Sequence, residues 1–161
     1  MSKNFDIIAS TTFGMEYVVK KEAQKLGFSN IEVSNGQVRF EGEFKDIAKA
    51  NIYLRSAERV YLLVGEFDAT DFDMLYEKTK ELNWSDLMPK NAEFPVSGNS
   101  VKSELHSVPT CQSIIKKAVV DNMKESYHKD WFKEDGPLFP IEVALYKDNA
   151  VISIDTSGAG L

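Results

Sequence analysis

The sequence contains a single cysteine, Cys111, among its 161 residues. One cysteine excludes an internal disulfide and any multi-cysteine zinc site, and it suits a reducing compartment. No run approaches the ~18 apolar residues of a membrane helix, and the N-terminus lacks the sustained apolar core of a signal peptide. We therefore expect a cytoplasmic protein without a membrane partner.

The sequence also lacks the short motifs of common active sites: GxSxG, HExxH, CxxC and the P-loop. Its two histidines, His106 and His128, lie far apart and have no metal-ligand spacing. Cys111 and Ser113 lie near His106 in sequence, so a nucleophile–base pair is an alternative, but no strained elbow or orienting acid accompanies them. His128 ends a predicted helix, where its cation suits the helix dipole. We expect no catalytic residue in this chain.

The acidic residues Asp68, Asp71 and Asp73 come close to a calcium-binding pattern. They lack the glycine at the required position and the closing glutamate of an EF-hand. We interpret them as the start of a helix, because carboxylates are favoured at the positive end of the helix dipole. The glycines of segment 158–160 are followed by no helix, so they predict no phosphate cradle. We therefore expect neither a metal site nor a cofactor site.

An excess of basic residues is also missing. The chain has 19 Lys and Arg against 25 Asp and Glu, a formal net charge of −6, which argues against a nucleic-acid binder that uses its whole surface. The charge is uneven: residues 98–129 carry five basic and three acidic side chains, whereas 1–66 is neutral and the other stretches are acidic. A local basic strip within 98–129 is compatible with this distribution.

The apolar and charged content, 43% and 27%, is typical of a folded soluble protein. The first 66 residues alternate strand and helix patterns in the order β-α-β-β-α-β, which is the split β-α-β pattern of ferredoxin-like domains. The hairpin in its middle is predicted by Asn35-Gly36, a strong turn signal. The predicted elements are a strand over 5–11, a helix over 14–26, strands on either side of Asn35-Gly36, a helix over 44–55 and a strand over 59–67.

The remaining residues, 67–161, predict a second α/β domain, so the expected fold class is α+β with the domain boundary after residue 66. Pro95 places a short strand at a sheet edge, and Thr110 is the expected N-cap of the clearest helix. No pair of parallel strands joined by a helix is visible. The predicted elements are a helix over 71–84, a strand over 93–97, an irregular segment over 98–109, a helix over 111–127 and two strands around Asp148-Asn149.

The segment 97–124 points most clearly to a ligand. A helix start rich in hydroxyl groups and lysine offers backbone N–H groups, neutral donors and positive charge, which are the groups that contact phosphate. Helical spacing places Ser113, Lys117 and Lys124 opposite the apolar face, with Lys116 at its flank. The alternative is a solvated helix face after a capped loop. The hydroxyl and amide residues are Ser97, Asn99, Ser100, Ser103, Ser107, Thr110, Gln112 and Ser113.

The order of these segments resembles the N-terminal part of the bacterial THUMP-containing class I methyltransferases. That family is similar to the ribosomal RNA guanine-N2 methyltransferases, and its members are often labelled N6-adenine-specific DNA methylases. The resemblance covers essentially the whole chain. Its most specific pieces are Trp84 after its helix, the S-x-K-S-x-L-x-S-x-P-x-x-Q pattern that starts at Ser100 and leads into IIKKAVVD, and Asp155-Thr156-Ser157-Gly158.

The resemblance implies a ferredoxin-like domain over 1–66, followed by an RNA-binding THUMP domain over 67–161. It also implies a downstream methyltransferase domain in the same polypeptide, which uses S-adenosylmethionine and is not reached at Leu161. The expected partner is structured RNA, foremost ribosomal RNA. The alternatives are a THUMP module of another RNA-modifying enzyme, such as a thiouridine synthase, and a protein-interaction module. The implied RNA-facing positions are Lys102, Ser103, Ser107, Gln112, Ser113, Lys116 and Lys117.

Overall fold

A computed structural model describes residues 4–128 and 132–157 of the chain. The chain folds into two compact units, Met1–Leu63 with Asp155–Leu161, and Val64–Ile154. It passes from the first unit to the second within strand β4 (Arg59–Asp68) and returns at the end of strand β7 (Asn149–Asp155). Within the described ranges, no helix combines the length and the apolar character that crossing a membrane requires.

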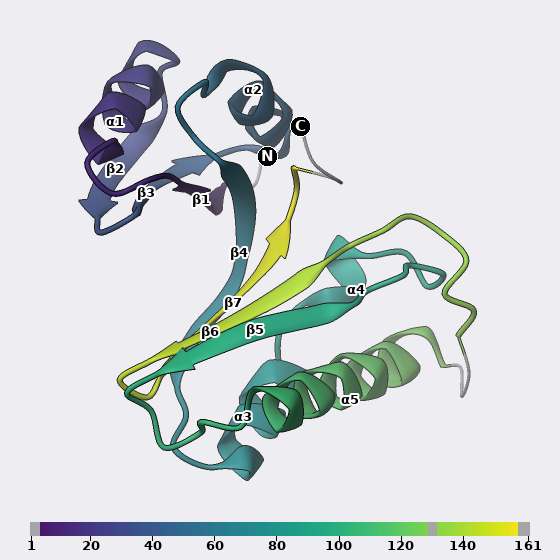
Figure 1. Cartoon of the computed structure of the whole chain (residues 1–161). Coiled ribbons are helices and arrows are strands. Elements are labelled where there is room, and N and C mark those ends of the chain that lie inside the picture. Colours follow the sequence, from purple (N-terminus) through teal and green to yellow (C-terminus); the bar gives the residue numbers. More distant parts are fainter. Residues whose placement is uncertain (1–3, 129–131, 158–161) are drawn as a thin grey trace. The chain divides into compact units, whose positions relative to one another are not determined.

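The first unit has the β-α-β-β-α-β order expected from the sequence. Its strands lie in the order β2-β3-β1-β4, and each neighbouring pair is antiparallel. Gly36 has a φ of 76°, as a two-residue hairpin turn requires, so the hairpin prediction is confirmed. In Figure 1 both helices of this unit lie over its strands. The elements are β1 (Phe5–Ser10), α1 (Glu16–Lys25), β2 (Ser29–Ser34), β3 (Gln37–Gly42), α2 (Phe44–Tyr53) and β4.

The end of β7 is bound to the first unit by side chains of the Asp155-Thr156-Ser157 segment. The Thr156 hydroxyl donates to the Val60 carbonyl at 2.7 Å, and the Val60 N–H donates to the Ser157 hydroxyl oxygen at 2.7 Å. The Ser157 hydroxyl also donates to Asn51 Oδ1 of α2 at 2.8 Å. These bonds give the hydroxyl groups of Thr156 and Ser157 a structural role. Residues 158–160, with the glycines noted in the sequence, lie outside the described residues.

The second unit contains a β-α-β unit that the sequence did not reveal, because β5 and β6 are parallel and α5 connects them. This β-α-β unit corrects the expectation that no parallel pair is present. The reason is that β5 continues through Gly98 to Val101, a stretch expected to be irregular. Pro95 precedes the strand, and β5 ends the strand order, as an edge strand should. The elements are α3 (Phe72–Lys80), α4 (Trp84–Leu87), β5 (Val96–Val101), α5 (Val108–Tyr127), β6 (Ile141–Tyr146) and β7.

The helix predicted over 71–84 is divided into α3 and α4. The chain turns after Lys80, and the fully buried Trp84 starts α4 while its indole N–H donates to the Thr79 carbonyl at 2.8 Å. The Asn122 amide of α5 donates to the carbonyls of Lys80 at 2.7 Å and Leu82 at 3.0 Å. Because the last carbonyls of a helix have no intrahelical donor, this amide stabilises the end of α3. It also explains a polar residue on the apolar face of α5.

Candidate nucleic-acid interface

The loop from β5 to α5 is ordered by its own hydroxyl groups. The Ser100 hydroxyl donates to the Leu105 carbonyl at 2.6 Å, and the Leu105 side chain is buried. The Ser103 hydroxyl donates to the Val101 carbonyl at 3.1 Å. Lys102 adopts the left-handed conformation with a φ of 50°, and its side chain is exposed. The loop therefore presents Lys102 to solvent from a fixed backbone.

The turn between β6 and β7 supports this loop from the side. The Lys147 N–H donates to the Val101 carbonyl at 3.1 Å, and the Asp148 N–H donates to the Ser103 hydroxyl at 2.9 Å. An Asp148 carboxylate oxygen accepts from the Glu104 N–H at 2.8 Å. The turn consists of Lys147 and Asp148, with φ values of 47° and 66°, so the prediction of a turn at Asp148-Asn149 was one residue too late. Exposed Lys147 thus lies beside the loop. The hairpin predicted around Asp148-Asn149 was the sequence signal that could have identified Lys147 as a turn residue.

The start of α5 differs from the sequence-based expectation. Ser107 is the N-cap, three residues before the predicted cap, so the assignment of Thr110 was wrong. The hydroxyl oxygens of Ser107 and Thr110 lie 2.8 Å apart, and the Ser107 side chain makes no capping hydrogen bond to the backbone. Pro109 lies in the first turn, where backbone N–H groups have no intrahelical acceptor. A residue without an N–H group is therefore well suited to this position, and it favours the early start of the helix. The first turn has no acidic residue, so its N–H groups favour an anion.

The other predicted contact residues occupy different sides of α5. Ser113 is exposed, and its hydroxyl donates to the Pro109 carbonyl at 3.1 Å. Gln112 is half-buried. Lys117 is exposed, with its Nζ atom 5.6 Å from the centre of the Tyr76 ring of α3. Ser113 and Lys117 are separated by four residues and share a side of the helix.

Lys116 is committed to contacts within the second unit. Its Nζ atom donates to the Phe94 carbonyl at 3.1 Å, forms an ion pair with Glu134 at 2.5 Å, and lies 3.9 Å from the centre of the Phe94 ring. The hydrogen bond and the charge of Lys116 lower the pKa of Glu134. Lys102 and Ser103 therefore lie in the ordered loop that leads into the start of α5. Lys116 lies apart from them and holds α5 against the segment around Phe94.

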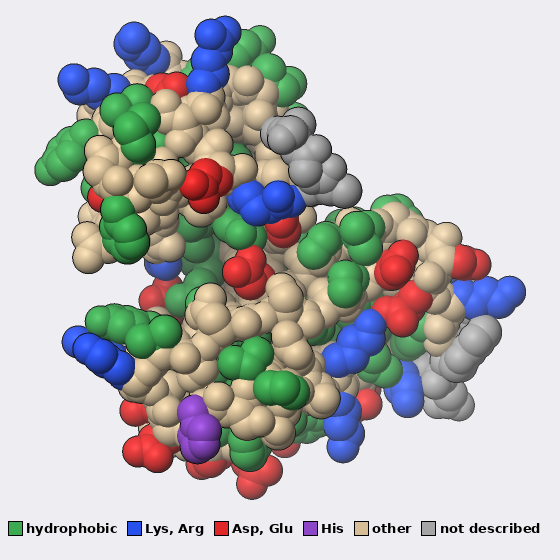
Figure 2. All heavy atoms as spheres, viewed as in Figure 1, with side chains coloured by type: hydrophobic (Ala, Val, Ile, Leu, Met, Phe, Trp, Pro, Cys, Tyr) green, Lys and Arg blue, Asp and Glu red, His purple; other side chains and the backbone are tan. Residues whose placement is uncertain are grey.

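Carboxylates lie among the lysines of this unit. The Tyr76 hydroxyl donates to the Asp121 carboxylate, and this hydrogen bond raises the pKa of Tyr76. Lys80 pairs with Glu125 at 2.9 Å. Figure 2 shows the same mixture, with basic side chains separated from one another on the face of the second unit that is in view. Any contact with a polyanion must therefore combine few charges with neutral donors.

We expect that replacing Lys116 with methionine will raise the pKa of Glu134 toward its ordinary range, because the pairing cation is removed. Since the folded-state pKa is lowered, the pair contributes stability above the unfolded pKa and loses it as the pH falls through the folded value. The difference in melting temperature between wild type and variant should thus be present at pH 7 and shrink in acid. At pH 7 the loss in the free energy of unfolding should be less than about 1 kcal/mol, because both groups are partly exposed.

The measurement is an NMR titration of the Glu134 side-chain carboxyl, together with thermal unfolding at several pH values. Lys117→Met is the matched control, because Lys117 forms no ion pair with Glu134. An unchanged Glu134 titration in Lys116→Met would contradict the assigned pair.

The alternative chemistries suggested by the sequence are not assembled. Cys111 is buried, which raises the pKa of its thiol, whereas His106 is exposed with Nδ1 3.0 Å from the Glu104 carbonyl oxygen. Asp71 is the N-cap of α3 and accepts from the Met74 N–H at 2.8 Å, so its interpretation as a helix start is confirmed. Within residues 4–128 and 132–157, no group of three or more potential ligand side chains could hold a metal.

Two features of the fold define the class of protein: an antiparallel β-α-β-β-α-β unit, and an α/β unit with a parallel β5-α5-β6 connection. Residues 6–61 match the RlmL ferredoxin-like domain, and residues 69–155 match the THUMP domain. The chain belongs to the THUMP domain family, and it carries an RlmL-type ferredoxin-like domain in front of the THUMP domain. The resemblance inferred from the sequence is confirmed.

Sequence relatives extend over the whole chain. The protein named "Putative RNA methyltransferase YpsC" of Bacillus subtilis is 47% identical over 161 residues, which are 99% of this chain and 42% of the relative. A crystal structure from Listeria monocytogenes, described as a predicted N6-adenine-specific DNA methylase, is 50% identical with a TM-score of 0.95, over 98% of this chain and 42% of that one. The structure of SMU.472, described as "a putative methyltransferase complexed with SAH", is 42% identical with a TM-score of 0.93, over 98% of this chain and 43% of that one. The chain thus spans less than half the length of these relatives.

A more distant structure shares the fold alone. A 4-thiouridine synthetase, solved in complex with RNA and bound ATP, has 14% identity and a TM-score of 0.60 over 95% of this chain and 41% of its own.

Proposed function

We propose that this chain is the RNA-binding, targeting module of an S-adenosylmethionine-dependent RNA methyltransferase that acts on ribosomal RNA guanine N2 in the cytoplasm. The module comprises a ferredoxin-like domain, residues 1–66, and a THUMP domain, residues 67–161. The observation that carries the proposal is the THUMP match over 69–155, together with 47% identity to a relative named as an RNA methyltransferase. The module holds structured RNA so that the target base reaches the catalytic domain of the same polypeptide.

The start of α5 supplies the chemistry for holding RNA. The first turn offers backbone N–H groups and the Ser107 hydroxyl as hydrogen-bond donors, and it contains no acidic residue. Lys102 adds an exposed positive charge from the loop before the helix. Lys147, which the sequence did not suggest, adds a second charge beside the loop. Such groups contact phosphate and sugar, so recognition rests on backbone shape rather than base sequence. The proposed RNA-facing residues are Lys102, Ser103, Ser107, Gln112, Ser113 and Lys117, with Lys147 added. Lys116 leaves the set implied by the sequence, because its ammonium group is bound to the Phe94 carbonyl and to Glu134.

The methyl donor belongs to the catalytic part of the polypeptide. The relative SMU.472 is described as a complex with SAH, which supports S-adenosylmethionine as the donor for the whole protein. In the described part of this chain, the parallel unit β5-α5-β6 has no glycine in its first connecting loop, residues 102–107. It therefore lacks the glycine-rich turn that lets a backbone approach a nucleotide cofactor. No methyl-transfer step is assigned to these residues.

The test is a titration of the chain with a labelled RNA hairpin at low salt. We expect Lys102→Glu combined with Lys117→Glu to weaken binding at least tenfold and to reduce the slope of log affinity against log salt by about two, one per lost phosphate contact. The matched control is Lys78→Glu with Lys90→Glu, which makes the same charge change elsewhere in the second unit. Equal affinities for the wild type and both double variants would reject this surface.

The alternative function is that of a THUMP module in a thiouridine synthase. It is supported by the shared fold of the 4-thiouridine synthetase. The encoded sequence after residue 161 distinguishes the two. A methyltransferase domain there supports the proposal, and an ATP-dependent sulfur-transfer domain supports the alternative.

A further inference from the structure

The outward face of α1 combines one aromatic residue with three lysines. Tyr17, Lys20, Lys21, Gln24 and Lys25 follow a spacing of 3, 4, 7 and 8 residues from Tyr17, so they lie along one side of the helix. The opposite side carries the buried residues Val19 and Ala23. The chain thus buries one side of α1 in the first unit and exposes a positively charged side.

Among the described residues, neither carboxylate of α1 forms an ion pair with a lysine of this side. Glu16 accepts a hydrogen bond from the Gly14 N–H at 2.5 Å, and Glu22 accepts from the Ser56 N–H at 3.0 Å. Both acids are therefore occupied by backbone donors of their own unit. Within the described part of the chain, neither Lys21 nor Lys25 forms an ion pair, and both are exposed. Their charges are available to an external anion.

Two aromatic rings lie at the start of this face. Phe13 is 76% exposed and Tyr17 is 68% exposed, and Lys20 Nζ lies 5.7 Å from the centre of the Tyr17 ring. A side chain at Gly36, in the β2–β3 turn, would come within 3.8 Å of the Phe13 ring, so this ring lies next to the hairpin. Figure 2 shows basic and hydrophobic side chains side by side on the surface over α1. Exposed apolar side chains that lie together on a surface mark an interaction site more often than single ones do.

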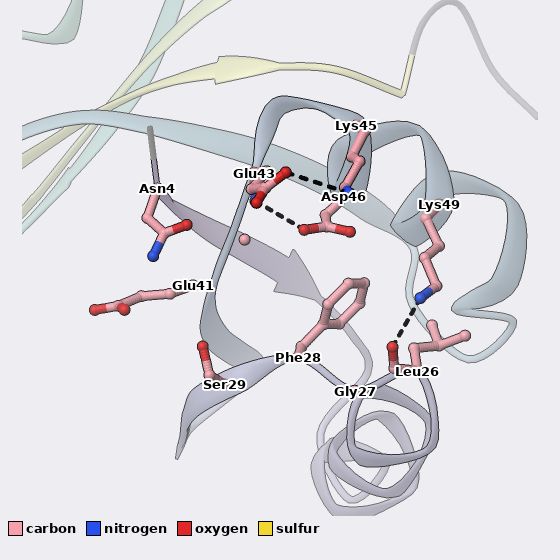
Figure 3. Close-up of a pocket in the computed structure, with 11 residues that line it drawn as sticks. Asn4, Leu26, Gly27, Phe28, Ser29, Glu41, Glu43, Lys45, Asp46 and Lys49 are labelled. Carbon is pink, nitrogen blue, oxygen red and sulfur yellow. Dashed lines mark hydrogen bonds and ion pairs between the residues drawn. The ribbon is translucent and has the colours of Figure 1, made fainter. Parts of the chain in front are cut away.

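The lysines of α2 provide a contrast within the same unit. Lys49 Nζ donates to the Leu26 carbonyl at 2.8 Å, and Lys45 pairs with Glu43 at 3.4 Å (Figure 3). Glu43 and Asp46 form a capping box at the start of α2, in a polar pocket of about 310 Å³. Both lysines of α2 in this pocket thus have partners within their own unit. On the α1 side, by contrast, Lys21 and Lys25 form no ion pair among the described residues and lie near two exposed aromatic rings.

We propose that the α1 face, defined as Phe13, Tyr17, Lys20, Lys21 and Lys25, is a second RNA-contact surface that binds unpaired nucleotides. The two rings stack on bases, and the lysines contact the phosphates between them; this combination is typical of single-strand binding and does not depend on base sequence. The inference rests on the proposed function and deepens it. The start of α5 holds structured RNA, and the α1 face holds a single-stranded extension of the same molecule.

The composition of the face favours RNA over a protein partner. Protein interfaces are depleted of lysine at their centre, where desolvation of an unpaired ammonium group is unfavourable. Here Lys20 and Lys21 directly follow Tyr17 along the face. A polyanion with flat bases complements both features at once.

The experiment compares two probes, a blunt RNA hairpin and the same hairpin with a single-stranded extension of about ten nucleotides. We expect Phe13→Ala with Tyr17→Ala, and separately Lys21→Glu with Lys25→Glu, to weaken binding of the extended probe about tenfold and to leave the blunt probe within twofold. The matched control is Ile52→Ala with Tyr53→Ala, which removes exposed side chains from α2 of the same unit. Circular dichroism checks that each variant is folded.

The outcomes separate the two proposals. If the wild type binds both probes, Lys102→Glu with Lys117→Glu weakens both, and the α1 variants bind like wild type, then the α1 surface is refuted while the proposed function stands. If the wild type binds neither probe, the proposed function fails. If the wild type forms a dimer without RNA and the aromatic variant does not, as judged by sizing, the face is a protein interface and the inference is overturned.

Discussion

Replacing Trp84 with alanine should lower the free energy of unfolding of the second unit by about 3–5 kcal/mol. The side chain is fully buried, and it begins α4 directly after the turn that ends α3. Removing it leaves a large cavity beside α5. It also removes the indole N–H that donates to the Thr79 carbonyl, so that a buried acceptor loses its partner.

Urea denaturation followed by circular dichroism measures this loss. Trp84→Phe is the informative companion, because it keeps an aromatic ring in the site while it removes the N–H donor and part of the volume; its cost should lie below that of Trp84→Ala, at about 2 kcal/mol. Tyr53→Ala, at a side chain that is 55% exposed, should change stability by less than about 0.5 kcal/mol. If Trp84→Ala were no more costly than Tyr53→Ala, the described packing of α3, α4 and α5 would be wrong.

Elements with a regular pattern and a clear stop signal were predictable from the sequence. The first unit is an example: alternating strands meet at Asn35-Gly36, and the structure has a two-residue turn there. The elements that were missed depend on contacts between distant residues. The helix predicted over 71–84 ends at Lys80, and Asn122, some 40 residues later, stabilises this end by binding the carbonyls of Lys80 and Leu82. No pattern within the segment itself encodes that break.

The parallel pairing of β5 with β6 was hidden for a similar reason. Ser97, Gly98, Asn99 and Ser100 have low strand propensity, and the segment has no apolar alternation. Its strand conformation comes from pairing with β6, where Gly98 lies opposite Val143. Tertiary context thus overrides local preference, and the hydroxyl groups that suggested a binding loop partly serve the strand and its turn.

The candidate contact residues show what charge counting along the sequence can and cannot separate. Lys102 is exposed in the loop before α5, and its contact with RNA stays a prediction, whereas Lys116 and Lys117 could not be told apart by sequence. Their difference comes from Glu134, which lies 18 residues from Lys116. The α1 face was missed because residues 1–66 are neutral in total. Only the structure shows that Glu16 and Glu22 are occupied by backbone donors.

Replacing Gly98 with alanine should also be costly, by about 1–3 kcal/mol, and valine should cost more. A Cβ atom at this position would lie 2.5 Å from Val143 Cγ1 and 2.6 Å from the Val143 carbonyl oxygen. The side-chain atom could move, but the carbonyl belongs to the backbone of β6. The two strands must therefore separate locally.

The displacement of β5 in Gly98→Ala should also disturb the proposed RNA interface. β5 leads directly into the loop that carries Lys102, and this loop is aligned by the bond from Lys147 N–H to the Val101 carbonyl. Displacement of β5 should shift the amide NMR signals of residues 102–107 and weaken binding of the RNA hairpin. Asn99→Ala, at an exposed neighbour on the same strand, is the control.

A double variant separates the two contacts made by the added Cβ. Gly98→Ala combined with Val143→Ala removes the clash with Cγ1 but leaves the clash with the carbonyl oxygen. We expect it to recover only part of the stability lost in Gly98→Ala, after correction for the cost of Val143→Ala alone. Full recovery would assign the whole cost to the Val143 side chain. Wild-type stability of Gly98→Ala itself would show that β5 and β6 are not paired as closely as described, and the ordered loop before α5 would lose its structural basis.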